Sequence, residues 1–251
     1  MLRRFAALGA VAAALLPLAG CGGATPTSAA THSSPPALPA PDPGDVLAAA
    51  VTKTTGVNLT VEITDSTGDD FLGSYDGTRH TAALEQAPGG TGLKVTVTPT
   101  DYYIGGLKAL KGETWRLKIA RLRDASSQAL LTDVLVPMTL LSGASGVQQT
   151  APGRYLGHID ATQVKGATPG EQKFLDHVLK AAGANAQTLV FTATVDEHGY
   201  LSGFKTTFPG LAGGKDVVYG LKLSDFGAPV TIVIPSGTKV VDAPDKAYAT
   251  L

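Results

Sequence analysis

Three stretches of the chain alternate apolar and polar residues with a period of two, and this pattern limits the fold more than any other feature. Their apolar positions are Leu59, Val61 and Ile63, then Leu93, Val95 and Val97, and then Trp115, Leu117 and Ile119. Successive side chains of a strand point to opposite faces, so each stretch predicts a strand with one apolar face. Turn-forming residues fill segments 65–70, 87–92 and 108–112. We therefore predict an antiparallel meander with one face against the core.

Helical signals lie before, between and after groups of strands. The first helix is predicted to begin after Asp42, an N-cap residue followed by proline, and to end at Gly56. Residues 122–141 carry apolar side chains at helical spacing but include Pro137, which predicts two short helices or one broken helix. A third helix is predicted for residues 168–183, which begin with a capping box.

Further strands are predicted in the second half of the chain. They fall at residues 147–149, 155–159, 188–196, 201–208, 216–225 and 229–234, with a hairpin turn at 197–199. Strands in runs, separated by helices that can all pack on the apolar face of the sheet, predict an α+β fold.

The N-terminus has the pattern of an export signal. Arg3 and Arg4 precede an apolar run that ends just before Cys21, the only cysteine of the chain. We expect residues 1–20 to be a signal peptide, because the run is shorter than the ~20 apolar residues of a spanning helix. Cys21 stands where a lipobox places the lipidated thiol, so we expect a diacylated lipoprotein on the extracytoplasmic face of the cell membrane. The alternative is a plain secreted protein.

Composition divides the remainder into a linker and one domain. Residues 21–42 are small, polar and rich in proline, which predicts a disordered linker, and residues 43–251 have the length of a single domain. Without Arg3 and Arg4 the chain keeps 18 basic residues against 21 acidic ones. This balance gives no electrostatic basis for binding nucleic acid, and we expect a monomer without disulfides.

A search for catalytic or metal-binding motifs favours a protein that is not an enzyme. The histidines, His32, His80, His158, His177 and His198, are widely spaced. They do not show zinc-ligand spacing, and Asp69, Asp70 and Asp101 lack the alternating oxygens of a calcium loop. The segment 143–146 is one residue short of the serine-hydrolase elbow and is predicted to be a loop, and the glycine clusters at 89–92 and 213–214 are predicted to be turns. We expect no cofactor.

Two spaced motifs carry a resemblance to a known family. One pairs DYYI at 101–104 with ETWRL at 113–117, and the other is YGLKLSDFGAPVTIVIP at 219–235. Because of these two motifs, residues 43–240 resemble the actinobacterial lipoproteins of the LppX/LprA/LprF/LprG type and their neighbours in the LolA-like superfamily. The resemblance implies a curved antiparallel half-barrel whose concave face is covered by helices and encloses an apolar cavity. It also implies a protein that carries amphipathic lipid or glycolipid across the envelope, with a transporter as a possible partner.

The alternating strands and the central helices supply candidates for the lining of such a cavity. They are Leu59, Val61, Ile63, Leu93, Val95, Val97, Trp115 and Leu117 from the sheet, with Val134, Met138 and Leu141 from the helices. The alternative for every one of them is ordinary core packing, because alternation identifies a buried face without showing what fills it. A second hypothesis is an envelope protein-interaction or signalling lipoprotein, without a ligand cavity, that binds its partner on the convex face.

Overall fold

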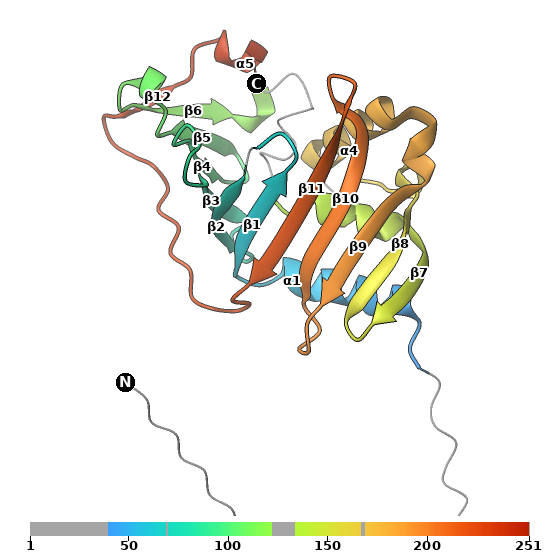
Figure 1. Ribbon diagram of the computed structural model, residues 1–251. Helices are drawn as coiled ribbons and strands as arrows, with labels where there is room; N and C mark the ends of the chain where they lie inside the picture. Colours follow the sequence, from blue (N-terminus) through green and yellow to red (C-terminus); the bar gives the residue numbers. More distant parts are fainter. Residues whose placement is uncertain (1–39, 69, 122–133, 167–168, 251) are drawn as a thin grey trace, which may run out of the picture. The chain divides into compact units, whose positions relative to one another are not determined.

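In the part of the chain that the structure describes, twelve strands form a single sheet with helices on one side (Figure 1). The computed structural model describes residues 40–68, 70–121, 134–166 and 169–250. The expected signal peptide, Cys21, Asp69 and most of the expected linker lie outside these residues, as do Leu130, Leu131 and the other predicted helical residues from 122 to 133. Described residues 40–250 belong to one compact unit.

The helices and strands have the following bounds. The helices are α1 (Pro43–Thr55), α3 (Val136–Thr139), α4 (Pro169–Ala182) and α5 (Ala247–Thr250). The strands of the first half are β1 (Leu59–Asp65), β2 (Phe71–Asp76), β3 (Thr81–Gln86), β4 (Lys94–Val97), β5 (Asp101–Gly105) and β6 (Thr114–Lys118). Those of the second half are β7 (Ala144–Ala151), β8 (Arg154–Ile159), β9 (Leu189–Val195), β10 (Leu201–Ala212), β11 (Lys215–Ser224) and β12 (Val240–Asp242).

Two antiparallel meanders meet in the middle of the sheet. The strand order is β12-β6-β5-β4-β3-β2-β1-β11-β10-β9-β8-β7, so β1 of the first meander pairs with β11 of the second. All described pairings are antiparallel except that of β12, which adds to the edge strand β6 in parallel. The predicted meander is confirmed, and β12 makes the sheet mixed.

The cross-strand register places the predicted apolar positions on one face. Val61 lies opposite Leu223, and Ile63 lies opposite Leu221. Val61, Leu221 and Leu223 are buried, whereas Lys222, between the last two, is exposed on the other face. Hence the period-two pattern separates an inner face from an outer face, as predicted.

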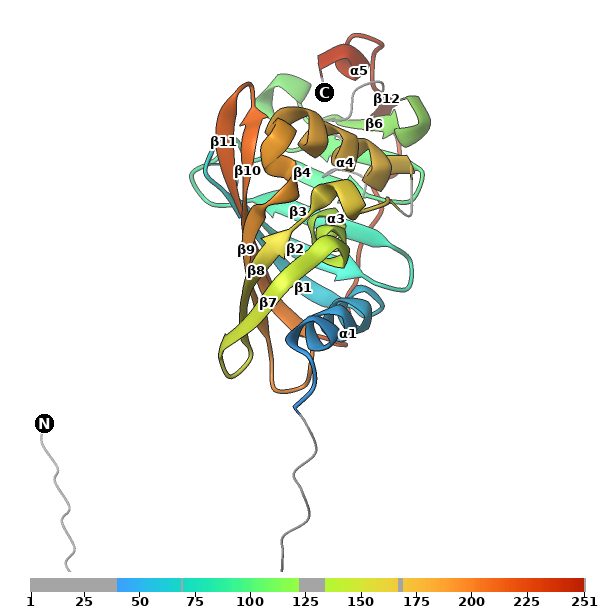
Figure 2. The same ribbon diagram turned by 90° about the vertical axis from the view of Figure 1, so that its right-hand side faces the viewer.

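The sheet bends so that its inner face is concave, and α1, α3 and α4 lie within the bend, whereas α5 lies at the β6 end of the sheet (Figure 2). The main helix-to-strand contacts are those of α1 with β7 and β10 and those of α4 with β10. This confirms the predicted α+β fold, a curved sheet with helices on its concave face. None of the helices in the described ranges is long and apolar enough to cross a membrane.

Local signals set the ends of α1. The Asp42 carboxylate accepts a hydrogen bond of 2.7 Å from the Gly44 N–H, which satisfies one free donor of the first turn. Gly56 is the C-cap residue, so both predicted ends of this helix are confirmed.

Thr54 joins the end of α1 to the start of β10, and its loss should destabilise the domain. Its buried hydroxyl donates to the Ala50 carbonyl (2.7 Å) and accepts from the Leu201 N–H (2.8 Å). In Thr54→Val the Leu201 donor stays buried without a partner, which should lower the free energy of unfolding by about 1–3 kcal/mol. Thr52→Val is the control, because the exposed Thr52 hydroxyl makes the same helical hydrogen bond, to the Ala48 carbonyl at 3.1 Å, on the solvent side of the helix. Equal shifts of the two urea midpoints would contradict this role.

Two sequence predictions are wrong, and a third is confirmed where the chain is described. Residues 144–146, predicted as a loop, begin β7. Pro137 lies in the first turn of α3, where its missing N–H has no helical acceptor, so a short helix begins here as one of the two predicted alternatives requires, and the other part of that prediction, residues 122–133, lies outside the described residues. Residues 229–234 alternate like a strand, yet they form none, and β12 follows at Val240 instead.

Candidate functional site

The predicted lining residues come together in one apolar cluster on the inner face. Leu59, Val61, Val95, Val97, Leu117, Val134, Met138 and Leu141 are buried in it, and Ile63, Leu93 and Trp115 pack against it partly buried. The structure thus places all of these side chains together. Core packing would also bury these side chains, so their burial does not distinguish a ligand-binding face from a filled core. The partly buried residues Ile63, Leu93 and Trp115 are therefore more informative.

Several large apolar side chains are only partly buried on the half of the inner face formed by β1–β6, which we call the open half. Ile63 and its partner Phe71 on β2 are only partly buried, and so is Trp115, the β6 partner of Ile104. On the other half, the large aromatic side chains Phe191 and Phe208 are 1% exposed each. In the part of the chain that the structure describes, the open half therefore includes apolar side chains that remain partly accessible.

The strands β2, β3 and β5 contribute inner-face residues that the sequence did not single out. Phe71 and Tyr75 face inward from β2, and Ala82 and Leu84 from β3. On β5, four consecutive residues from Tyr102 to Gly105 are buried, so no alternation marks its inner face. The cross-strand register identifies Tyr102, opposite Val97 and Leu117, as an inner-face residue.

Charges near the open half lie on the outer face. Burial alone would raise the pKa of the Asp101 carboxyl, but hydrogen bonds from Lys118 and Thr100 and the charges of Lys118 and Arg116 outweigh it and hold this pKa below its usual value. Lys118 Nζ lies 2.7 Å from the carboxylate. On the inner face, burial raises the pKa of the Tyr102 hydroxyl well above its usual value, so this group stays a neutral donor.

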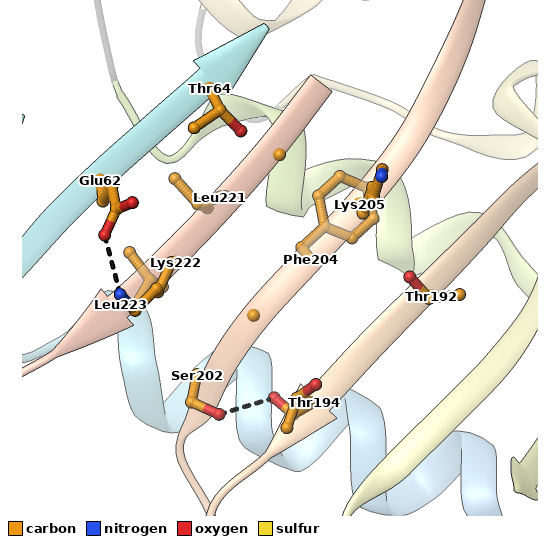
Figure 3. Close-up of a pocket in the computed structure, with 12 residues that line it drawn as sticks. Glu62, Thr64, Thr192, Thr194, Ser202, Phe204, Lys205, Leu221, Lys222 and Leu223 are labelled. Atoms are coloured by element: carbon orange, nitrogen blue, oxygen red, sulfur yellow. Dashed lines mark hydrogen bonds and ion pairs between the residues drawn. The ribbon is translucent and has the colours of Figure 1, made fainter. Parts of the chain in front are cut away.

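The outer face carries a shallow pocket over β1, β11, β10 and β9, which we call the outer trough (Figure 3). Its volume is about 550 Å³. Gly203 and Gly220 lie on the outer face of neighbouring strands, where any side chain would project into the trough. Glycine within a strand weakens it and often marks a place where another molecule approaches the backbone.

Polar side chains surround these glycines. Lys222 Nζ lies 2.9 Å from the Glu62 carboxylate, and the Ser202 hydroxyl donates to the Thr194 carbonyl at 3.3 Å. The other outward-facing side chains are those of Thr64, Thr192 and Lys205. Such a set can form hydrogen bonds and one or two ionic contacts, but it contains no nucleophile paired with a base.

Metal ligands do not cluster among the residues that the structure describes. No group of three or more histidine, cysteine, aspartate or glutamate side chains could hold an ion there. His80 shares a hydrogen bond of 3.0 Å with the Tyr75 hydroxyl, and His198 lies in the β9–β10 turn that the sequence predicted.

Several solved structures are similar to this chain, and two of them are named below. No protein-family model and no curated protein matches the chain. The chain is similar to LprF from Mycobacterium bovis, with 16% identity and a TM-score of 0.48, over 79% of this chain and 99% of LprF. It is also similar to an uncharacterized conserved protein from Thermus thermophilus, with 11% identity and a TM-score of 0.39, over 79% of this chain and 98% of the other. Both are likenesses of fold at low sequence identity.

Proposed function

We propose that this domain binds an amphipathic lipid or glycolipid by its acyl chains on the open half of the inner face and carries or presents it in the cell envelope. In this proposal the diacylated Cys21 anchors the chain to the extracytoplasmic face of the membrane, and the protein performs no chemical reaction on its cargo. A transporter would be the partner that delivers or removes the lipid.

The observation that supports the proposal is the incomplete burial of apolar side chains on a concave face. Ile63, Phe71 and Trp115 come from three different strands, and all pack against the core while remaining partly accessible. Isolated exposed apolar residues are common on protein surfaces, but several on one concave face favour a ligand.

The energetics suit a carrier that must both bind and release. Each methylene removed from water contributes ~0.8 kcal/mol, so affinity grows with the length of acyl chain that is buried. Apolar contacts have no directional requirement, so chains of differing length and saturation can share one face. A polar headgroup would stay at the edge of the sheet, where a membrane or a partner can reach it.

Native mass spectrometry with organic extraction tests this function. Residues 22–251, which contain the whole compact unit, are to be purified without detergent from an actinobacterial host. The expected result is one lipid per chain in the native spectrum and a matching lipid in the extract. A spectrum of ligand-free protein that takes up no added phospholipid would contradict the proposal.

The outer trough supports a second candidate, an envelope lipoprotein that binds another protein on its convex face. Three exposed apolar residues lie on the same outer face, namely Leu72 (54%), Leu156 (39%) and Val190 (54%). In register, Leu72 pairs with Glu62 and Leu156 with Thr192, so both flank the trough. Ligand-free protein in the extraction experiment would favour this candidate.

A further inference from the structure

A β-bulge in β10 lies in the floor of the outer trough. The register between β9 and β10 shifts between Leu201 and Gly203, so β10 has one residue more than β9 at this point. As a result, Ser202 and Gly203 both lie on the outer face, whereas Leu201 and Phe204 on either side of them are buried. Bulges bend a strand locally and are common beside functional sites. The hollow over β10 therefore has a definite cause in the backbone.

The backbone itself does not require glycine at position 203. Its φ lies outside the left-handed region, and an added Cβ would lie 3.6 Å from the Thr194 side chain, an ordinary van der Waals contact. Gly220 differs, because a Cβ there would lie 2.5 Å from Thr64 Oγ1. Glycine within a strand weakens it, so another residue at position 203 would strengthen β10. The effect of glycine here is to leave the trough open.

The side chains that line the trough carry more positive than negative charge. Among the described lining residues the cations are Lys205 and Lys222, and the anion is Glu62. Lys222 and Glu62 form an ion pair, but the exposed ammonium of Lys205 has no partner among the residues that the structure describes. Arg154, which lies opposite Thr194 on β8, is exposed and likewise lacks a described carboxylate partner. An anion in the trough would therefore be attracted.

The remaining polar groups determine which anion fits. The hydroxyls of Thr64 and Thr192 make no hydrogen bond within the described part of the chain, so they can donate to a ligand. A phosphate group offers several oxygens that only accept, and lysine binds it as a point charge. The Glu62 carboxylate is an acceptor, which suits a hydroxyl of the same ligand.

The size of the trough excludes a match to phosphate alone. Its volume of about 550 Å³ lies within the range of roughly 300–1,000 Å³ that is usual for small-molecule sites. A phosphate ester of a polyol, such as glycerol or a sugar, has both the acceptor oxygens and the hydroxyl donors that these side chains require.

We propose that the outer trough binds a phosphate ester of a polyol, with the phosphate at Lys205 and a ligand hydroxyl at Glu62 (Figure 3). The same chemistry occurs in a free polyol phosphate and in the headgroup of an anionic phospholipid. This inference goes beyond the proposed function, because the trough lies on the opposite face of the sheet from the open half. Either site can bind its ligand without the other.

Titration of ¹⁵N-labelled residues 22–251, followed by nuclear magnetic resonance, tests the site with glycerol 3-phosphate as the probe. The amide signals of Gly203, Lys205 and Gly220 should shift, and glycerol without phosphate should not shift them. Lys205→Gln should weaken binding about tenfold or more, the range for one hydrogen bond to a charged group. Lys180→Gln, at an exposed position of α4, is the matched charge control and should bind the probe normally.

Gly203→Val fills the trough without removing a donor. Because the added Cβ has room and valine suits a strand, the urea midpoint should stay the same or rise, while binding of glycerol 3-phosphate is lost. Thr207→Val is the matched control, since Thr207 lies on the same face of β10, opposite Val218 and outside the trough. It should bind the probe as the unaltered chain does.

Co-sedimentation with vesicles separates the two sources of the ligand. Vesicles of phosphatidylglycerol are compared with vesicles of phosphatidylcholine, whose headgroup has no net charge and no hydroxyl. Binding to phosphatidylglycerol that Lys205→Gln and Gly203→Val both abolish would assign the trough to a lipid headgroup, and binding of glycerol 3-phosphate alone would assign it to a soluble ester.

Three results would refute the proposal. The first is that glycerol 3-phosphate shifts none of the trough amides and the chain binds neither kind of vesicle. The second is that Gly203→Val binds as well as the unaltered chain, and the third is that Lys180→Gln weakens binding as much as Lys205→Gln, which would indicate diffuse attraction to charge. Each of these results leaves lipid binding on the open half to be decided by its own experiment.

Discussion

Replacing Phe174 with alanine is expected to lower the free energy of unfolding by about 3–5 kcal/mol, the range for removing a large aromatic side chain from a core. Phe174 is 1% exposed on α4. Its ring meets that of Phe208 on β10 edge to face, with centroids 5.7 Å apart and planes at 89°. Phe208 in turn lies 6.2 Å from the Tyr219 ring. The substitution would leave a cavity between α4 and the sheet that this rigid cluster cannot fill.

Urea unfolding followed by far-ultraviolet circular dichroism measures the effect. Phe174→Leu should recover part of the loss, because it restores some of the buried volume. Lys180→Ala, at an exposed position of the same helix, should change stability by less than about 0.5 kcal/mol. A Phe174→Ala effect as small as that of Lys180→Ala would show that α4 is not held on the sheet by this cluster.

The strands that the sequence predicted are those whose two faces differ in polarity. In β9 a buried side chain alternates with an exposed one along the whole strand, and β1 and β11 show the alternation over part of their length, so each strand carries its own evidence of burial. The helix α1 was equally visible, because Asp42 and Gly56 mark its ends by local chemistry. Both features are set by residues that lie close together in the chain, so the amino-acid sequence alone is enough to predict them.

Features that depend on tertiary partners were missed. At Gly73 on β2 an added Cβ would lie 1.9 Å from the Ala83 carbonyl oxygen, so close contact with β3 requires glycine where a strand pattern would have an apolar residue. Residues 229–234, in contrast, alternate apolar and polar side chains but do not form a strand. Alternation is enough to predict a strand from local sequence, but a strand also needs the edge of a neighbouring strand with which its backbone can form hydrogen bonds.

The candidate site was predictable only as a buried face. Alternation placed Val95 and Leu117 on the inner side, and both are buried there. It could not show that Ile63 and Trp115 would be only partly covered, because coverage depends on where the helices lie. The outer trough was likewise hidden, since Gly203 and Gly220 are far apart in sequence and become diagonal neighbours only through the β10–β11 register.

Ile63→Glu is expected to weaken lipid binding at least about a hundredfold. The substitution removes the apolar contact of Ile63 with lipid, and full burial of such a side chain contributes about 1.5–3 kcal/mol. In addition, the new carboxylate must lose its hydration when lipid covers it, which costs further binding free energy. Together these costs exceed the roughly 2.8 kcal/mol that corresponds to a hundredfold change. Burial under lipid should raise the pKa of the introduced carboxyl, so part of the binding should return as the pH falls and the neutral form is restored.

Thr64→Glu is the matched control for this change. Thr64 follows Ile63 on β1, is exposed on the outer face and lines the outer trough. It therefore receives the same charge on the same strand, away from the open half, and should bind the lipid as the unaltered chain does. Since Ile63 is only partly buried, both variants should remain folded by circular dichroism. If Thr64→Glu loses lipid and Ile63→Glu retains it, the ligand lies on the outer face, because the two substitutions differ mainly in the side of the sheet that they alter.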